Sequence, residues 1–211
     1  MKITLLSLLI LIVSCTYPNY NEMDENKKLE YKPEKIDLNN HSFTSGKVYS
    51  LDIEELNSII KLGKEYKILF FNQIWCETNV NAMECLIKKD LKEFDLIFIS
   101  GLDWIFTKQY KSYLKDSEIK NNMYLIDLEK YPIQSGLSIG QSTLKKDKSF
   151  LKDFFDKETY KEFENEESFP LLIVIDKNKN VIYKSNEIGC ENSDCNSLYD
   201  KVLNQIRNNI N

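Results

Sequence analysis

Cys76 is the residue of this sequence that is best placed to do chemistry, because it stands where a predicted strand meets a predicted helix. The run 68–71 is continuously apolar, which is typical of a strand buried on both faces. From Val80 to Phe94 apolar residues recur three and four apart, which predicts a helix beginning near Glu77. Unpaired N–H groups and the positive end of the helix dipole stabilise a thiolate in such a position and lower its pKa. The sequence therefore offers Cys76 as a nucleophilic thiol.

Cys85 is a candidate second thiol on the same predicted helix. Nine residues of helix separate it from Cys76 by about half a turn and about 13 Å along the axis. A disulfide needs Cα atoms within about 7 Å, so we expect that Cys76 and Cys85 do not pair while the helix is intact. The alternative for Cys85 is a free or partly buried thiol with no redox role.

Cys190 and Cys195 lie in a polar loop with four residues between them. In an exported protein this spacing favours a structural disulfide, and a pair that resolves adducts of Cys76 is the alternative. No metal site is expected, since four-coordinate sites need histidines or more cysteines nearby, and the single histidine, His41, is remote in the sequence. The sequence predicts no cofactor.

Composition excludes several classes of function. The 211 residues fit one domain with a short appendage. The net charge of −5 argues against nucleic acid as a partner. With one histidine, in the N-terminal region, a hydrolase that relies on a Ser-His or Cys-His pair is also excluded.

Residues 1–14 have the pattern of a signal peptide, with Lys2 followed by an apolar stretch too short to span a bilayer. The sequence around Cys15, Ile-Val-Ser-Cys, resembles the bacterial lipoprotein signal, in which the cysteine is lipidated and becomes the first mature residue. A plain secretory peptide is the alternative. The lipoprotein interpretation places the protein in the bacterial cell envelope, attached to a membrane by lipid, with its domain outside the cytoplasm.

Residues 15–41 are polar and aperiodic, which predicts a flexible tether that lifts the domain off the membrane.

Residues 42–211 are predicted to form one α/β domain, because strands and helices alternate along the chain. The strands are expected at 67–71, 95–100, 122–127, 171–176 and 181–184, and the helices near 52–63, 77–94, 104–119 and 198–206. The segment 129–168 is a predicted insertion, a loop followed by a helix around Phe150 and Phe154. A connection of this length is often a lid or a partner surface.

Three motifs stand in an order that resembles the thioredoxin superfamily, above all its membrane-tethered TlpA/ResA-type thiol–disulfide oxidoreductases, with peroxiredoxin-like redoxins nearby. They are Gly63-Lys64 with the apolar run and Phe71-x-x-x-Trp75-Cys76, then Phe169-Pro170 with the apolar run to Asp176, then the hairpin from Asp176 to Gly189. The resemblance covers about residues 42–210. It implies a three-layer thioredoxin-like fold with a central mixed sheet. It also implies a cis Phe169–Pro170 bond opposite Cys76, and a catalytic groove formed by Cys76, Trp75 and Pro170.

The sequence departs from that family at the second cysteine. The family site is Cys-x-x-Cys, and here the run is Cys76-Glu-Thr-Asn79. Peroxiredoxins carry a threonine three residues before their peroxidatic cysteine, and here that position holds Gln73. They also use an arginine to polarise the peroxide, and the one arginine, Arg207, is in the last predicted helix. A peroxidase is therefore not expected either.

Two functions remain open. The first is thiol–disulfide exchange through Cys76 with protein thiols or disulfides of the cell envelope. The second is a non-catalytic module that binds protein or peptide in the same groove, with Cys76 an inert thiol.

Overall fold

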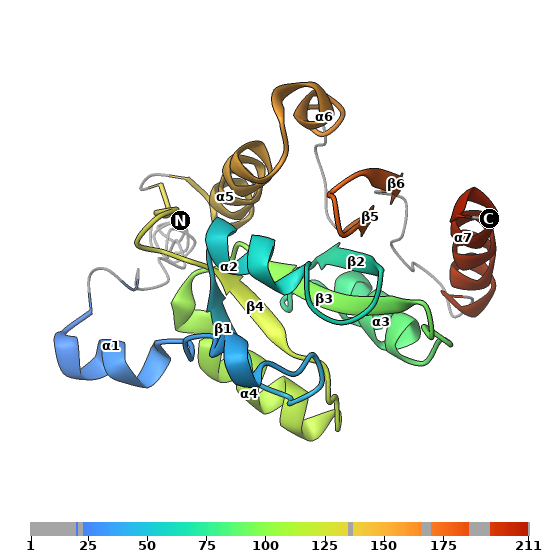
Figure 1. The fold of residues 1–211 in the computed structure, drawn as a ribbon. Coiled ribbons are helices and arrows are strands. Elements are labelled where there is room, and N and C mark those ends of the chain that lie inside the picture. Colours follow the sequence, from blue (N-terminus) through green and yellow to red (C-terminus); the bar gives the residue numbers. More distant parts are fainter. Residues whose placement is uncertain (1–19, 21–22, 135–136, 166–169, 186–194, 211) are drawn as a thin grey trace, which may run out of the picture.

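A six-stranded mixed sheet forms the centre of the protein, which is described here by a computed structural model for residues 20, 23–134, 137–165, 170–185 and 195–210. The strands follow the order β1-β4-β3-β2-β5-β6 across the sheet (Figure 1). Their bounds are Val48–Leu51 for β1, Tyr66–Phe71 for β2, Phe94–Ser100 for β3, Met123–Ile126 for β4, Leu171–Asp176 for β5 and Val181–Ser185 for β6.

The strands β1, β4, β3 and β2 are mutually parallel, β5 is antiparallel to β2, and β6 is antiparallel to β5. The carboxyl ends of the four parallel strands therefore share one edge of the sheet with the amino end of β5. Residues that follow Phe71 and Ser100, or precede Leu171, all lie at this edge, which we call the carboxyl edge.

Helices cover both faces of the sheet, and the result is three layers. The helices α2 (Ile53–Ile59) and α5 (Ile139–Phe154) cover one face, and α3 (Glu77–Ile87), α4 (Thr107–Asp116) and α7 (Cys195–Ile210) cover the other. Figure 1 shows α5 above the sheet and α4 below it. Burial on both faces explains the continuous apolar runs, since alternate residues of one strand enter different cores.

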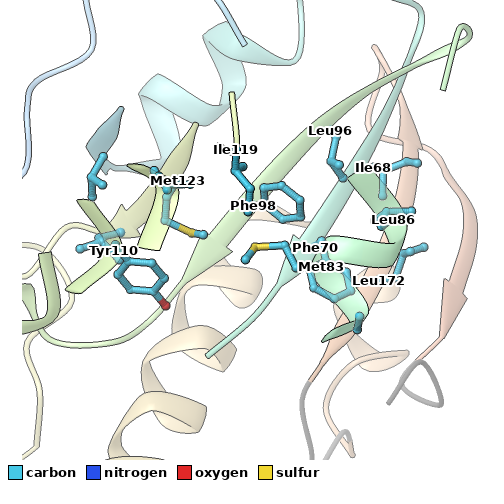
Figure 2. Close-up of a cluster of buried hydrophobic side chains, with 14 of the residues drawn as sticks. Ile68, Phe70, Met83, Leu86, Leu96, Phe98, Tyr110, Ile119, Met123 and Leu172 are labelled. Carbon is cyan, nitrogen blue, oxygen red and sulfur yellow. The ribbon is translucent and has the colours of Figure 1, made fainter. Parts of the chain in front are cut away.

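The strand β2 illustrates this division. Ile68 and Phe70 join the core beneath α3, α4 and α7, and Leu69 and Phe71 join the core beneath α2 and α5. In Figure 2 Phe70 lies with Met83 of α3 and Leu172 of β5 in the first of these cores. The predicted α/β domain with a buried mixed sheet is confirmed by this arrangement.

Several predicted boundaries are wrong. The predicted helix 77–94 ends at Ile87, because Phe94 is already paired with Tyr66 as the first residue of β3. The insertion 129–168 holds two helices, since α5 stops at Phe154 and a short α6 (Lys157–Lys161) begins after the cap residue Asp156.

The prediction of a flexible tether over residues 15–41 is wrong for much of its described part. Helix α1 (Glu25–Tyr31) is capped by the Asp24 side chain, and a short 3-10 helix, η2, spans Leu38–Asn40. Between them Glu34 makes a parallel bridge to Tyr49 of β1. The sequence does not indicate these elements, because α1 buries no residue and its contacts are with distant parts of the chain.

No helix in the described part of the chain has the length and apolar character needed to cross a bilayer.

Candidate functional site

Cys76 lies at the carboxyl edge of the sheet, at the junction between β2 and α3. The strand β2 ends at Phe71, residues 72–75 form a loop, and Cys76 is the N-cap residue of α3 with an extended backbone (φ −101°, ψ 111°). The first N–H groups of α3 therefore surround the thiol, as the sequence predicts.

Hydrogen bonds to the neighbouring strand β3 hold the loop before Cys76. The Asn72 backbone N–H donates to the carbonyl of Ile99 at 2.9 Å, and its side-chain amide donates to the same carbonyl at 3.2 Å. The Cys76 N–H closes a turn by donating to the Gln73 carbonyl at 3.0 Å. Hydrogen bonds at both ends of this short loop, to β3 at Asn72 and within the turn at Cys76, therefore fix the position of the thiol.

A buried tyrosine supports the same loop from α4. The Tyr110 hydroxyl accepts a hydrogen bond from the Ile74 N–H at 3.4 Å and donates to Ser100 Oγ at 2.8 Å. Tyr110 has no exposed surface, and Figure 2 shows its ring among the side chains of the core. The end of β3 and the loop of Cys76 are therefore joined through one pair of hydroxyl groups.

The pKa of Cys76 lies below the usual value for a thiol. Partial burial raises this pKa, but the Asn79 N–H, the Asn79 side chain, and the side chain and N–H of Thr78 outweigh that effect because they stabilise the thiolate. The thiol itself makes no conventional capping hydrogen bond. A lowered pKa means a larger thiolate fraction near neutral pH, and the thiolate is the nucleophile.

Asn79 occupies the first turn of α3 and is almost fully buried, with 2% of its surface exposed. Its side-chain oxygen has no hydrogen-bond partner among the described residues. Asn79 has no thiol, but its backbone N–H and its side chain are among the donors that lower the pKa of Cys76.

Trp75 is one of three large apolar residues that are exposed in the described part of the chain, with 50% of its surface accessible. A Cβ placed on Gly140 would lie 3.9 Å from Trp75 Cη2, so the indole is next to the first turn of α5. This turn is fixed by a capping box between Ser138 and Gln141. The predicted insertion therefore contributes a helix end beside the cysteine loop.

Pro170 is buried and immediately precedes β5. Because Leu171 pairs with Phe71, the antiparallel register places Pro170 at the carboxyl edge, beside the residue that follows β2. The cis bond expected at this proline involves Phe169, which lies outside the described residues.

Cys85 differs from Cys76 in its surroundings. It packs against the core beneath α3, and burial raises its pKa. Cys76 and Cys85 are both free thiols, and the continuous helix α3 runs from one to the other. The raised pKa makes Cys85 a weaker nucleophile near neutral pH than Cys76.

Cys15, Cys190 and the side chain of Cys195 lie outside the described residues, so lipidation and the expected disulfide stay predictions. His41 is found away from Cys76, at the amino ends of β1 and β4, with its Nε2 2.9 Å from the Tyr124 hydroxyl. Among the described residues no group of three or more His, Cys, Asp or Glu side chains could hold a metal ion.

A buried charged pair on α5 was not predicted from the sequence. Lys146 and Asp147 are 3% and 1% exposed. The Lys146 ammonium donates to the carbonyl of Ile126 at 2.7 Å, and burial lowers its pKa to about 8. Burial raises the pKa of Asp147 well above its usual range, against the opposing effects of Lys146 and the Gly101 N–H. The run Lys145-Lys-Asp-Lys148 does not indicate this burial, because only the packing of α5 decides which two of the four residues are buried.

No protein-family model matches this sequence, and no curated protein matches it. Among solved structures, the chain is similar to the pneumococcal exposed lipoprotein thioredoxin from Streptococcus pneumoniae, with 13% identity over 75% of this chain and 96% of that one and a TM-score of 0.40. It is also similar to the C-terminal domain of an uncharacterized protein from Bacteroides fragilis, with 19% identity over 60% and 74% of the two chains and a TM-score of 0.36. A third similar structure is AhpC from Mycobacterium tuberculosis, with 11% identity over 68% of each chain and a TM-score of 0.37. At these scores the likenesses carry no argument about the site, whose interpretation rests on its own geometry.

Proposed function

We propose that this chain is a lipid-anchored protein of the bacterial cell envelope whose thioredoxin-like domain exchanges thiols and disulfides through Cys76. The observation that carries the proposal is the Cys76 thiol at the N-terminus of α3, with a pKa lowered by the donors of Thr78 and Asn79. Trp75 and Pro170, at the same edge of the sheet, are the residues that would line the groove for a partner chain.

The reaction begins with the Cys76 thiolate attacking one sulfur of a partner disulfide. The partner S–S bond breaks, a mixed disulfide forms at Cys76, and the departing sulfur leaves as a thiolate that takes up a proton. A second thiol must then attack Cys76 to release the partner. Position 79 cannot supply this thiol, and neither can Cys190 and Cys195 if they form the expected disulfide, so it comes from another protein or a small thiol and remains bound to Cys76 in a new mixed disulfide. A further thiol then attacks the sulfur of that bound thiol, forms a disulfide with it and releases Cys76 as a thiolate.

The alternative is a non-catalytic module that binds protein or peptide, and two features favour it. Asn79 replaces the second thiol, and Trp75 offers half of its surface as an aromatic contact beside Cys76. Under this alternative the thiol would be unreactive.

Alkylation separates the two functions, with Cys85 as an internal reference. We expect Cys76 to react with iodoacetamide near pH 7 faster than Cys85 and faster than free cysteine, because its pKa is lowered and that of Cys85 is raised. The rate for Cys76 should reach its plateau at lower pH than the rate for Cys85. Mass spectrometry of the two cysteine peptides measures both rates in one sample. A Cys76 thiol no faster than Cys85 would contradict the exchange proposal and support the binding module.

Anchoring is tested by Cys15→Ser. This change should leave the protein unprocessed or release it from membranes, because the thiol that carries the lipid is lost. The measurement is membrane fractionation after labelling with a fatty-acid analogue, with Cys85→Ser as the matched control that keeps Cys15. Labelled, membrane-bound Cys15→Ser protein would refute lipidation at this residue.

A further inference from the structure

The described part of the domain reaches back to Tyr20, far before the predicted boundary at residue 42. Only 8% of the Tyr20 surface is exposed, and its ring meets Trp104 edge-on with a centroid distance of 5.2 Å. The Tyr20 backbone N–H donates to Asp103 Oδ2 at 3.2 Å. Both ring and backbone of Tyr20 are thus bound to the turn that follows β3.

The residues after Tyr20 continue this attachment. Helix α1, at the left of Figure 1, packs against α4 and the short 3-10 helix η3 (Trp104–Phe106). Glu30 of α1 forms an ion pair with Lys108 at 2.5 Å, and the Lys32 ammonium lies 5.7 Å from the centre of the Trp104 ring. Since Glu34 then pairs with β1, the position of Tyr20 is fixed relative to the sheet.

Tyr20 is attached at the edge of the sheet that carries Cys76. Asp103 follows the end of β3 at Ser100, as the Cys76 loop follows the end of the neighbouring parallel strand β2. A chain of hydrogen bonds through Ser100 and Tyr110 connects the two places. Ser100 Oγ accepts from the Leu102 N–H at 3.3 Å and from the Tyr110 hydroxyl, which in turn accepts from Ile74 in the Cys76 loop.

The distance from Tyr20 to the lipid attachment residue is bounded by the length of the chain. Five residue steps separate Cys15 from Tyr20, and a fully extended chain spans at most about 3.6 Å per step, or about 18 Å. A flexible chain over the whole of residues 15–41 would instead average about 30 Å end to end and would allow any orientation of the domain. The attachment of Tyr20 removes most of that freedom.

We propose that the lipid on Cys15 holds the carboxyl edge of the sheet, with Cys76, toward the membrane surface. The partners of the thiol are then thiols and disulfides in the membrane-proximal segments of membrane proteins, not those of proteins dissolved in the envelope. Leu29 on the same α1 that follows Tyr20 is 74% exposed, which suits a helix lying near lipid headgroups. This inference rests on the lipidation of Cys15 stated under the proposed function.

The orientation can be measured with the full lipidated chain in phosphatidylcholine vesicles that contain a phosphatidylethanolamine bearing a maleimide on its headgroup. The reference thiol is supplied by Asn178→Cys, because Asn178 is exposed in the β5–β6 turn at the opposite edge of the sheet. Labelling of each thiol by the lipid maleimide is divided by its labelling with a dissolved maleimide, which removes differences in intrinsic reactivity. We expect the normalised value for Cys76 to exceed that for the thiol at position 178 by about fivefold or more, since effective concentration falls steeply where the linker cannot span.

A matched variant carries about 20 Gly/Ser residues inserted between Cys15 and Tyr20, which lengthens the connection and leaves the domain unchanged. In this variant the preference of the lipid maleimide for Cys76 should vanish, while the lipid on Cys15 and the reaction of Cys76 with dissolved maleimide remain.

Equal labelling of the two thiols in the lipidated native chain would overturn the orientation alone. A native chain whose N-terminal peptide carries no lipid would overturn the anchor and this inference together, and would leave exchange at Cys76 untouched. A correctly oriented Cys76 that forms no mixed disulfide would refute the exchange reaction and the assignment of its partners, and would leave the orientation standing.

Discussion

Asn79→Cys is expected to raise disulfide reductase activity by about tenfold or more and to shorten the lifetime of mixed disulfides at Cys76. Asn79 lies in the first turn of α3, where its side chain and N–H already act on the Cys76 thiol. A thiol at that position attacks a mixed disulfide within the same molecule, at an effective concentration that an external thiol rarely reaches. In the native chain a mixed disulfide must wait for an external thiol, so it should be long-lived. The measurements are an insulin reduction assay and thiol-trapping gels.

Asn79→Ser is the matched control, because it shortens the side chain in the same way without adding a sulfur. It should lose the contribution of the Asn79 amide to the low pKa of Cys76, and so slow alkylation of Cys76 at pH 7 without creating reductase activity. Cys76→Ser should abolish mixed disulfides in either background. Rapid reduction by the native chain that is lost in Cys85→Ser would show that α3 opens and that Cys85 resolves the adduct. If no variant exchanges thiols, the binding-module alternative is correct.

Gly101→Ala is expected to lower the free energy of unfolding by about 1–3 kcal/mol, the usual cost of forcing an extra methyl group into a filled core. A Cβ at residue 101 would lie 2.5 Å from Asp147 Oδ1 and 2.8 Å from Asp147 Cγ. Asp147 is 1% exposed and is the neighbour of the buried Lys146 on α5, so its carboxyl group has little room to retreat. The measurement is denaturant unfolding followed by circular dichroism.

Gly140→Ala provides the comparison within the same protein. A Cβ at residue 140 would meet Trp75 Cη2 at an ordinary 3.9 Å, and residue 140 is in the first turn of α5. We expect this variant to gain a few tenths to about 1 kcal/mol, because alanine loses less backbone entropy in a helix than glycine. Adding Asp147→Ser to Gly101→Ala tests the clash through a double-mutant cycle. A Gly101→Ala protein as stable as the native one, or a cycle without coupling, would show that the carboxyl group moves aside freely.

The sequence by itself determined five of the six strands of the central sheet and the place of the reactive thiol. The apolar runs at 68–71, 96–99 and 171–175 are local signals, and strands buried on both faces produce them wherever the chain places them. The position of Cys76 at the start of α3 follows from the change of apolar period around it, and the N–H groups that lower its pKa are its immediate neighbours. These properties depend on a few consecutive residues, so they can be read from them.

Tertiary structure alone decided which residues surround that thiol and that the domain includes Tyr20. Tyr20 belongs to the domain because Asp103 and Trp104, more than 80 residues away, bind it. Lys146 and Asp147 are buried because α5 crosses the ends of β3 and β4, and Trp75 lies beside Gly140 for the same reason. Local propensity carries no information about such contacts, since the free energy that fixes them comes from burial and hydrogen bonds between segments whose proximity exists only in the folded chain.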